Sequence, residues 1–185
     1  MAFAKIERDQ VLDRLFEVFR TKGYDGASMA DLAEATGLKK ASLYHRFPDG
    51  KLSMADAVLD SVVNWTDRNI VQVVQSEGSP EERLDQVLRM IHELYRGGEV
   101  DCTLRALSHG SASALFQEKI GRIFKTWINA FADLAIDFGH DKAHAVQLGA
   151  TTVGQIQGTL ILSVTLGDNS LFEKALAEIK SRFLT

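Results

Sequence analysis

Apolar residues recur along the chain with the spacing of amphipathic helices. In residues 4–22 they fall on one side of a 3.6-residue period, and most of the charged residues lie elsewhere. These apolar positions are Ile6, Leu12, Leu15, Phe16 and Phe19. Gly23 follows directly and predicts the end of this helix. Because almost every later stretch repeats the same periodicity, the sequence predicts an all-α fold.

Two short helices follow, joined by a tight glycine turn. Ser28 is placed to cap a helix over 29–36, and Asp31, three residues later, completes a variant of the capping box. Gly37 stops that helix, and a third helix is predicted from about residue 39 to about residue 47.

Longer helices are predicted for the rest of the chain. After a Pro-Asp-Gly turn at 48–50, a helix runs from Lys51 to about residue 76 and ends before a break that has Ser79 as a cap and Pro80 at the first helical position. The later helices are predicted over 81–96, 103–109, 113–138, 142–166 and 169–183. We divide the chain at residue 50 into an N-terminal three-helix domain, 1–50, and a larger helical domain, 51–185.

Composition and charge limit the class of protein. Hydrophobic residues make up 45% and charged residues 25%, as in ordinary soluble globular domains, and only 2 prolines interrupt the helices. The net charge is −4, but residues 1–51 hold 9 Lys or Arg against 8 Asp or Glu, whereas the remainder holds 12 against 17. Any nucleic-acid binding must therefore depend on where the basic side chains point rather than on the total charge.

Three features bear on where the protein acts. A single cysteine, Cys102, excludes an internal disulfide and suits a reducing compartment. The first ten residues, MAFAKIERDQ, lack the apolar core of a signal peptide, so we expect a cytoplasmic protein. Residues 143–166 contain no Asp, Glu, Lys or Arg, which raises a membrane span as an alternative. We reject that alternative and predict a buried helix, because His144 and several Gln and Thr residues in this stretch are costly in lipid.

The second and third predicted helices have the pattern of a helix-turn-helix unit. Ala33 is small enough to let the helices approach, and Leu43 with Phe47 anchors the last helix. Residues 28–47, SMADLAEATGLKKASLYHRF, resemble the DNA-binding signature of the TetR/AcrR family of repressors, and the likeness covers about the first 60 residues. The family commonly places a lysine three residues after the phenylalanine, whereas here Lys51 follows Phe47 by four.

This resemblance implies a ligand-responsive transcriptional repressor that binds a palindromic double-stranded DNA operator as a homodimer and is released by a small-molecule effector. It assigns residues 1–50 to DNA binding and residues 51–185 to effector binding and dimerisation. The alternative is a helical adaptor or an enzyme that does not bind DNA. The sequence has no Gly-rich phosphate loop, nucleophile elbow or strong metal motif, so we expect no enzymatic activity, no catalytic residues, no cofactor and no metal.

The third helix supplies most of the candidate DNA contacts. Lys39 and Lys40 open it, where a recognition helix enters the major groove and a lysine donates to guanine or to phosphate. The alternative for these two is a solvated pair on an exposed turn. Ala41 and Ser42 are small, which lets the backbone approach base edges.

Further candidates are phosphate contacts. The resemblance implies that Tyr44 and His45 clamp phosphate; the alternatives are a half-buried aromatic and a plain surface histidine. Ser28 and Lys51 each begin a helix near the predicted DNA face, and a helix N-terminus favours an anion. Lys5 and Arg8, at the start of the first helix, are either further contacts or ordinary solvated charges.

A stripe of small residues predicts a dimer interface. Ala150, Gly154 and Gly158 recur every four residues and let another helix approach closely. The resemblance implies that the last two long helices form a four-helix interface between two copies, with packing inside one chain as the alternative. The predicted interface residues are Ala150, Gly154, Gly158, Leu171, Phe172 and Leu176.

The effector pocket is predicted from large or polar residues on helices that should surround the centre of the larger domain. They are Trp65, Met90, His92, Tyr95, Phe124, Trp127, Ile128, Phe131 and Gln155. The alternative is that these side chains form core. We expect Cys102 to be passive, since neighbouring Asp101 disfavours a thiolate, and we expect His140 and His144 to mark the start of a surface helix rather than a metal site.

Overall fold

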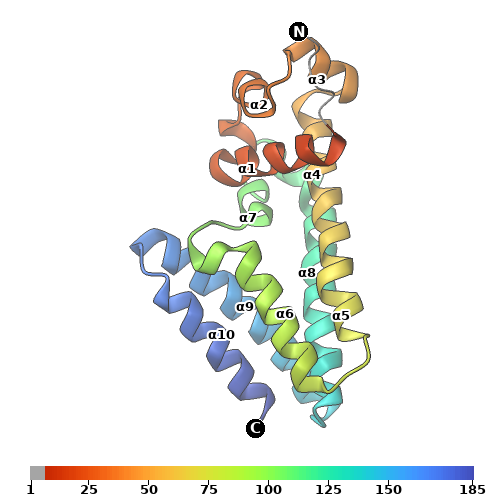
Figure 1. Cartoon of the computed structure of the whole chain (residues 1–185), viewed down its shortest axis with the longest axis vertical. Coiled ribbons are helices and arrows are strands. Elements are labelled where there is room, and N and C mark those ends of the chain that lie inside the picture. Colours follow the sequence, from red (N-terminus) through yellow and green to blue (C-terminus); the bar gives the residue numbers. More distant parts are fainter. Residues whose placement is uncertain (1–6) are drawn as a thin grey trace. The chain divides into compact units, whose positions relative to one another are not determined.

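The computed structural model describes residues 7–185, and every regular element in that range is a helix (Figure 1). The all-α prediction is confirmed. The elements are α1 (Arg8–Gly26), α2 (Met29–Thr36), α3 (Lys40–Arg46), α4 (Lys51–Thr66), the π-helical turn η1 (Asp67–Val71), α5 (Gln72–Val74), α6 (Pro80–Leu94), the 3₁₀ turn η2 (Arg96–Gly98), α7 (Thr103–Leu107), α8 (Ser113–Asp137), α9 (Lys142–Leu166) and α10 (Ser170–Phe183).

The helices form two compact units, each built from two stretches of sequence. The first unit combines the described residues up to Val62 with Thr103–Ile120. The second unit combines Val63–Cys102 with Gly121–Thr185. The division at residue 50 that we expect from the sequence is a single cut in the chain, and it stays a prediction of which segment carries which function.

In the first unit, α1 packs against α2 and α7. Leu15 and Phe19 of α1 are buried, as the apolar period predicts, while Leu12 and Phe16 are half-buried. Val11, which the predicted face did not include, is buried as well. Lys5 and Ile6 lie outside the described residues. Gly23 has a positive φ of 64°, so the regular helix ends there, as predicted, and a short helical stretch continues to Gly26. A β-carbon on Gly23 would lie 3.2 Å from the carbonyl oxygen of Ala106, which shows how closely α7 approaches α1.

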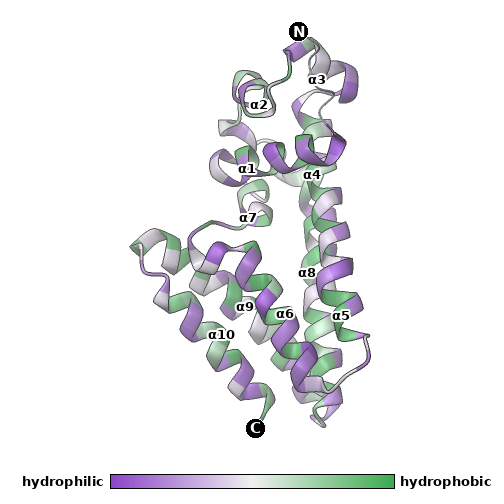
Figure 2. Cartoon of the chain, viewed as in Figure 1, coloured by the Kyte–Doolittle hydropathy of each residue, from purple (hydrophilic) through white to green (hydrophobic). Residues whose placement is uncertain are grey.

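In the second unit, α6 and α9 pack against α10. Hydrophilic and hydrophobic residues alternate along α6 and α10, as expected for helices with one buried face (Figure 2). The predicted Ser79 cap and the proline at the start of α6 are confirmed, and Glu82 completes a capping box. The indole Nε1 of Trp127 donates to the Thr66 hydroxyl at 3.0 Å within the core of this unit. Among the described residues, no helix combines the length and the apolar character needed to cross a membrane.

The long helix predicted from Lys51 to about residue 76 is interrupted by the π-helical turn η1. Thr66, Ile70 and Val74 are all buried and lie four residues apart. In a regular α-helix, repeated four-residue steps drift around the axis. A π-type turn holds more residues, so it keeps these three positions on the inward side. The structure therefore differs here from the uninterrupted helix that periodicity predicts, because the burial of these three residues favours a wider turn.

Candidate nucleic-acid interface

The turn between α2 and α3 is fixed by both backbone and side-chain contacts. Gly37 ends α2, as predicted, and caps it in the left-handed conformation with a φ of 68°. The Arg14 guanidinium of α1 donates to the carbonyl oxygens of Ala35 and Thr36, each at 3.3 Å. These carbonyls belong to the negative end of the helix dipole, where a cation is stabilising. Arg14 therefore holds α1 to the end of α2 that leads into the recognition helix.

Helix α3 is anchored on one side and open on the other. Leu43 is fully buried and Phe47 is 6% exposed, as the sequence predicts for the two anchoring residues. Lys39 is the N-cap, and it and the next three residues lie on the surface. The exposed positions are Lys39, Lys40, Ala41, Ser42, Tyr44 and His45. The structure thus gathers the predicted contacts of the third helix on one short, anchored element.

Ser28 takes part in a complete capping box at the start of α2. Its hydroxyl accepts from the backbone N–H of Asp31 at 3.1 Å and donates to the Asp31 carboxylate at 2.7 Å. A hydrogen bond from Lys22, at 2.6 Å, and those from Ser28 hold the pKa of Asp31 well below its usual range. An ionised carboxylate therefore occupies this helix end beside the Ser28 hydroxyl. A contact between Ser28 and DNA stays a prediction.

Lys51 has a different environment from the lysines of α3. Its side chain is half-buried, and its Nζ lies 4.4 Å from the centre of the Tyr24 ring, within cation–π range. Hydrogen bonds from Ser111 and then the positive charge of Lys51 lower the pKa of Asp25. Lys51 follows Phe47 by four residues rather than the family's three, and at this position it packs against the end of α1. A contact between Lys51 and DNA stays a prediction.

The structure also shows a basic hollow that sequence reasoning did not assemble. It has a volume of about 320 Å³, and the buried Val11 and Phe47 are among the residues that line it. Arg8, His45 and Arg46 complete its lining, and none of the described residues that line it is acidic. The sequence pattern assigns no role to Arg46, and it leaves Arg8 as either a DNA contact or a solvated charge. The available signal was the adjacency of two basic residues at the end of the recognition helix.

The small-residue stripe on α9 divides into two glycine environments. Ala150, Gly154 and Gly158 are exposed, and a β-carbon on either glycine would meet nothing within 4 Å in the described part of the chain. Gly149, which we did not single out from the sequence, makes the close contact instead. A β-carbon there would overlap the carbonyl oxygen of Ile128 on α8. The packing of α9 on α8 within one chain therefore uses Gly149 and leaves the predicted stripe open.

The predicted interface residues of α10 are placed mostly inward. Phe172 is fully buried and Leu176 is 8% exposed, while Leu171 is half-buried. The apolar face of α10 is thus used for the core of the second unit, which corrects the assignment of Phe172 and Leu176 to a surface between copies. The outward side of α10 instead carries polar and small residues.

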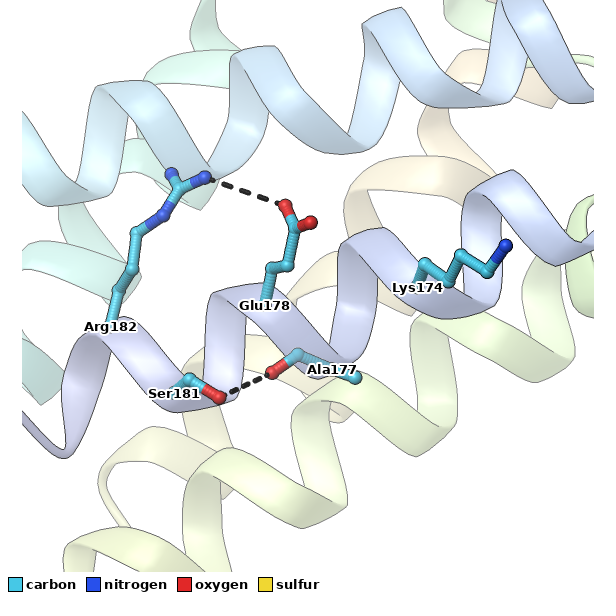
Figure 3. A pocket seen from close by; sticks show the side chains of 5 residues that line it. All are labelled: Lys174, Ala177, Glu178, Ser181 and Arg182. Atoms are coloured by element: carbon cyan, nitrogen blue, oxygen red, sulfur yellow. Dashed lines mark hydrogen bonds and ion pairs between the residues drawn. The ribbon is translucent and has the colours of Figure 1, made fainter.

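That outward side of α10 is hollowed beside α9 (Figure 3). The hollow has a volume of about 540 Å³ and is lined by Lys174, Ala177, Glu178, Ser181 and Arg182. Arg182 and Glu178 form an ion pair at 3.8 Å, and their side chains point toward one another (Figure 3). Gln155 of α9 donates to Glu178 at 2.9 Å, and its own amide oxygen is buried and has no hydrogen-bond partner among the described residues.

The predicted effector-pocket residues occupy several environments in the second unit. Tyr95, Trp127 and Phe131 are buried in the core. The rings of Trp65 and Trp127 lie 6.1 Å apart, so these two are brought together. Met90, Phe124 and Ile128 are half-buried. His92 and Gln155 instead contact carboxylates of α10: His92 lies 3.6 Å from Glu173, and Gln155 donates to Glu178. Their role in effector binding stays a prediction.

The cysteine and the two histidines lie outside any cluster of metal-binding groups. Cys102 is buried, and its sulfur accepts a hydrogen bond from the Tyr95 hydroxyl at 3.5 Å. The same hydroxyl accepts from the Gln157 amide at 3.2 Å. The rings of His140 and His144 stack 4.9 Å apart at the start of α9. Within residues 7–185, no three His, Cys, Asp or Glu side chains are grouped so as to hold a metal ion.

A short, anchored third helix with an exposed basic end, in a chain whose described elements are all helical, is typical of helix-turn-helix transcriptional regulators. Residues 11–58 match the family described as bacterial regulatory proteins of the tetR family. Residues 70–178 match the C-terminal domain of LmrA/YxaF-like transcriptional regulators. The chain belongs to the TetR family of transcriptional regulators, which is not a family of enzymes.

Individual relatives agree with this assignment along nearly the whole chain. The uncharacterized HTH-type transcriptional regulator YxaF of Bacillus subtilis is 25% identical over 170 residues, which is 88% of this chain and 87% of that protein. The crystal structure of a TetR transcriptional regulator from Legionella pneumophila has a TM-score of 0.81 and 18% identity, covering 97% of this chain and 99% of that one. CifR in complex with 26-bp operator DNA has a TM-score of 0.74 and 22% identity, covering 99% of this chain and 98% of that one.

Proposed function

We propose that this chain is a ligand-responsive transcriptional repressor that binds a palindromic operator as a homodimer and is released by a small-molecule effector. The observation that carries the proposal is the exposed face of α3, where Lys39, Lys40 and Tyr44 stand free of the core while Leu43 and Phe47 hold the helix in place. The structural likeness to CifR bound to its operator supports the same use of the fold. Operator binding places its site of action in the cytoplasm.

Within this proposal, the residues divide into base and backbone contacts. Lys39 and Lys40, at the N-terminal end of α3, are placed to donate to guanine or phosphate in the major groove. Ala41 and Ser42 leave room for the backbone to approach the bases. The backbone contacts are assigned to Ser28, Tyr44, His45 and Lys51, together with Arg8 and Arg46 of the basic hollow.

The proposed dimer uses the open stripe of α9 and the hollow of α10. Ala150, Gly154 and Gly158 present little side chain, so a second copy can approach the α9 backbone closely. The lining of the adjacent hollow includes the small side chains of Ala177 and Ser181, which also favour a close approach. In a two-fold dimer the same surface of both copies meets, so one stripe and one hollow from each chain are sufficient.

The proposed effector binds in the second unit, near the aromatic residues Trp65 and Trp127. A ligand that binds better to a dimer whose recognition helices are badly spaced for the operator shifts the population toward that dimer and releases DNA. This mechanism needs no cofactor and no metal.

The test is recovery of genomic DNA fragments by the purified protein, followed by affinity measurements on the recovered sequence at several salt concentrations. We expect enrichment of a short palindrome and an affinity that falls steeply as salt rises. Lys39→Ala/Lys40→Ala should abolish this binding while circular dichroism and the oligomeric state stay unchanged. The matched control is Lys125→Ala/Lys142→Ala, which removes the same charge from exposed positions of the second unit.

An equal loss of affinity in both double variants would show that total charge rather than the α3 face governs binding. Weak, sequence-blind binding by protein that has been refolded free of ligand would overturn the operator proposal itself.

A further inference from the structure

Gly50, in the turn between α3 and α4, is held by backbone hydrogen bonds on both sides. Its N–H donates to the carbonyl oxygen of Phe47 at 2.9 Å, and its own carbonyl accepts from the N–H of Met54 at 3.1 Å. Its φ is 59°, in the left-handed region that glycine adopts without steric cost. The turn therefore fixes the position of the Gly50 Cα relative to the end of α3.

The side chain that lies against this Cα is Tyr44. A β-carbon on Gly50 would lie 2.9 Å from Cε1 of Tyr44 and 3.7 Å from its Cδ1 and Cζ. The first distance is closer than real side-chain contacts, so the ring occupies the space that any other residue at position 50 would fill. Tyr44 nevertheless remains 49% exposed. One part of the ring thus rests on the turn, and the remainder is open to a partner.

We infer that Gly50 is a positioning residue for DNA recognition: its missing side chain lets the Tyr44 ring rest on the turn, and this holds the phenol ready for a phosphate. An exposed aromatic side chain without such a support loses rotamer freedom when it binds, and the loss weakens affinity. A ring that is already seated loses less. The inference rests on the proposed function, because it needs Tyr44 to touch DNA.

The chain contains a matched control for the backbone effect. Gly37, in the same unit, has a φ of 68°, close to that of Gly50. A β-carbon there would have as its nearest neighbour Nη1 of Arg14 at 3.8 Å, an ordinary contact distance. Gly37→Ala therefore introduces comparable backbone strain in the helix-turn-helix without displacing an aromatic ring.

The experiment compares Gly50→Ala with Gly37→Ala, each in the presence of Tyr44 and in a Tyr44→Ala background. Affinity for the recovered operator is measured by fluorescence anisotropy, and stability is measured by urea unfolding. We expect Gly50→Ala to weaken binding roughly tenfold more than Gly37→Ala, as for one lost hydrogen bond to a charged group. In the Tyr44→Ala background the two glycine variants should bind equally.

A second variant separates folding from positioning. Asparagine tolerates the left-handed conformation better than alanine, so Gly50→Asn relieves part of the strain but still places a β-carbon against Tyr44. Fluorine NMR of protein labelled with 3-fluorotyrosine should show a shifted Tyr44 resonance in Gly50→Asn and an unchanged one in Gly37→Ala, both without DNA.

Several outcomes would overturn the inference. One is equal loss of affinity in Gly50→Ala and Gly37→Ala, and another is a loss in Gly50→Ala that persists in the Tyr44→Ala background. If Tyr44→Ala alone leaves operator binding intact while Lys39→Ala/Lys40→Ala abolishes it, the positioning role is wrong and the proposed function stands. If none of these changes affects binding, the proposed function fails as well.

Discussion

At the scale of single residues, the chain uses the same capping device in both units with different surroundings. Ser28 and Asp31 form a capping box at the start of α2, and Ser79 and Glu82 form one at the start of α6. Both serines accept a backbone N–H and stand at exposed helix ends. Only Ser28 lies in the helix-turn-helix, so a comparison of the two separates helix capping from DNA contact.

We expect Ser28→Ala and Ser79→Ala each to lower the free energy of unfolding by about 1 kcal/mol, because each removes one cap. Ser28→Ala should also weaken operator binding, whereas Ser79→Ala should not. Urea unfolding and fluorescence anisotropy measure the two effects. If Ser79→Ala weakens operator binding as much as Ser28→Ala does, reduced stability alone explains the loss, and Ser28 has no role at the DNA.

At the scale of helices, the two kinds of glycine in α9 have opposite consequences. Gly149 is a point of close approach, since a β-carbon would overlap the carbonyl oxygen of Ile128 and lie 3.0 Å from the backbone nitrogen of Ala132. Gly154 lies on the same helix with open space around it. The same substitution therefore tests packing at one position and intrinsic helix propensity at the other.

Gly149→Ala should destabilise the chain by roughly 1–3 kcal/mol, because the added methyl group forces α9 away from α8. Gly154→Ala should leave the stability of the protomer unchanged or raise it by up to about 1 kcal/mol, because alanine is the better helix former. Unfolding by urea at a protein concentration low enough to favour protomers is the measurement. Equal effects of the two changes would contradict the close approach at Gly149.

Periodicity and capping signals predicted most of the helices because these are local properties. The bounds of α2 and α9 agree with the predicted 29–36 and 142–166, since each has a cap before it and a glycine after it. The π-helical turn η1 was not predicted, because it depends on which residues must face the core of the second unit. The joining of α7 to the first unit likewise depends on contacts distant in sequence, such as the approach of Ala106 to Gly23.

The candidate site was predictable to the same extent. The open face of α3 follows from the buried Leu43 and Phe47, which the pattern of apolar residues reveals. A pattern does not distinguish a helix face buried in the core from one buried between copies, so Phe172 was misplaced. It also does not show contacts across a turn, so the close approach of the Tyr44 ring to Gly50 required the structure. The same holds for the presence of Arg8 and Arg46 in one hollow.

At the scale of the whole molecule, the proposed recognition of a palindrome requires two copies of α3. One short helix reads few bases, and each good base contact contributes only about 1–3 kcal/mol of discrimination. A dimer brings the second recognition helix to the second half-site as an effectively intramolecular event, which multiplies the affinity without any new kind of contact. Operator affinity should therefore depend on residues of α9 that lie outside the helix-turn-helix.

Gly158→Leu tests this dependence. The leucine projects from an exposed position with nothing within 4 Å in the described chain, so the protomer should fold normally while the second copy is kept away. We expect sedimentation velocity to show protomers, and we expect affinity for the palindrome to fall to that for a single half-site. Gly121→Leu on α8, also without neighbours within 4 Å, is the matched control and should keep both the dimer and the affinity. A Gly158→Leu protein that remains dimeric places the interface elsewhere, whereas a protomer that still binds the palindrome at full affinity removes the need for a dimer.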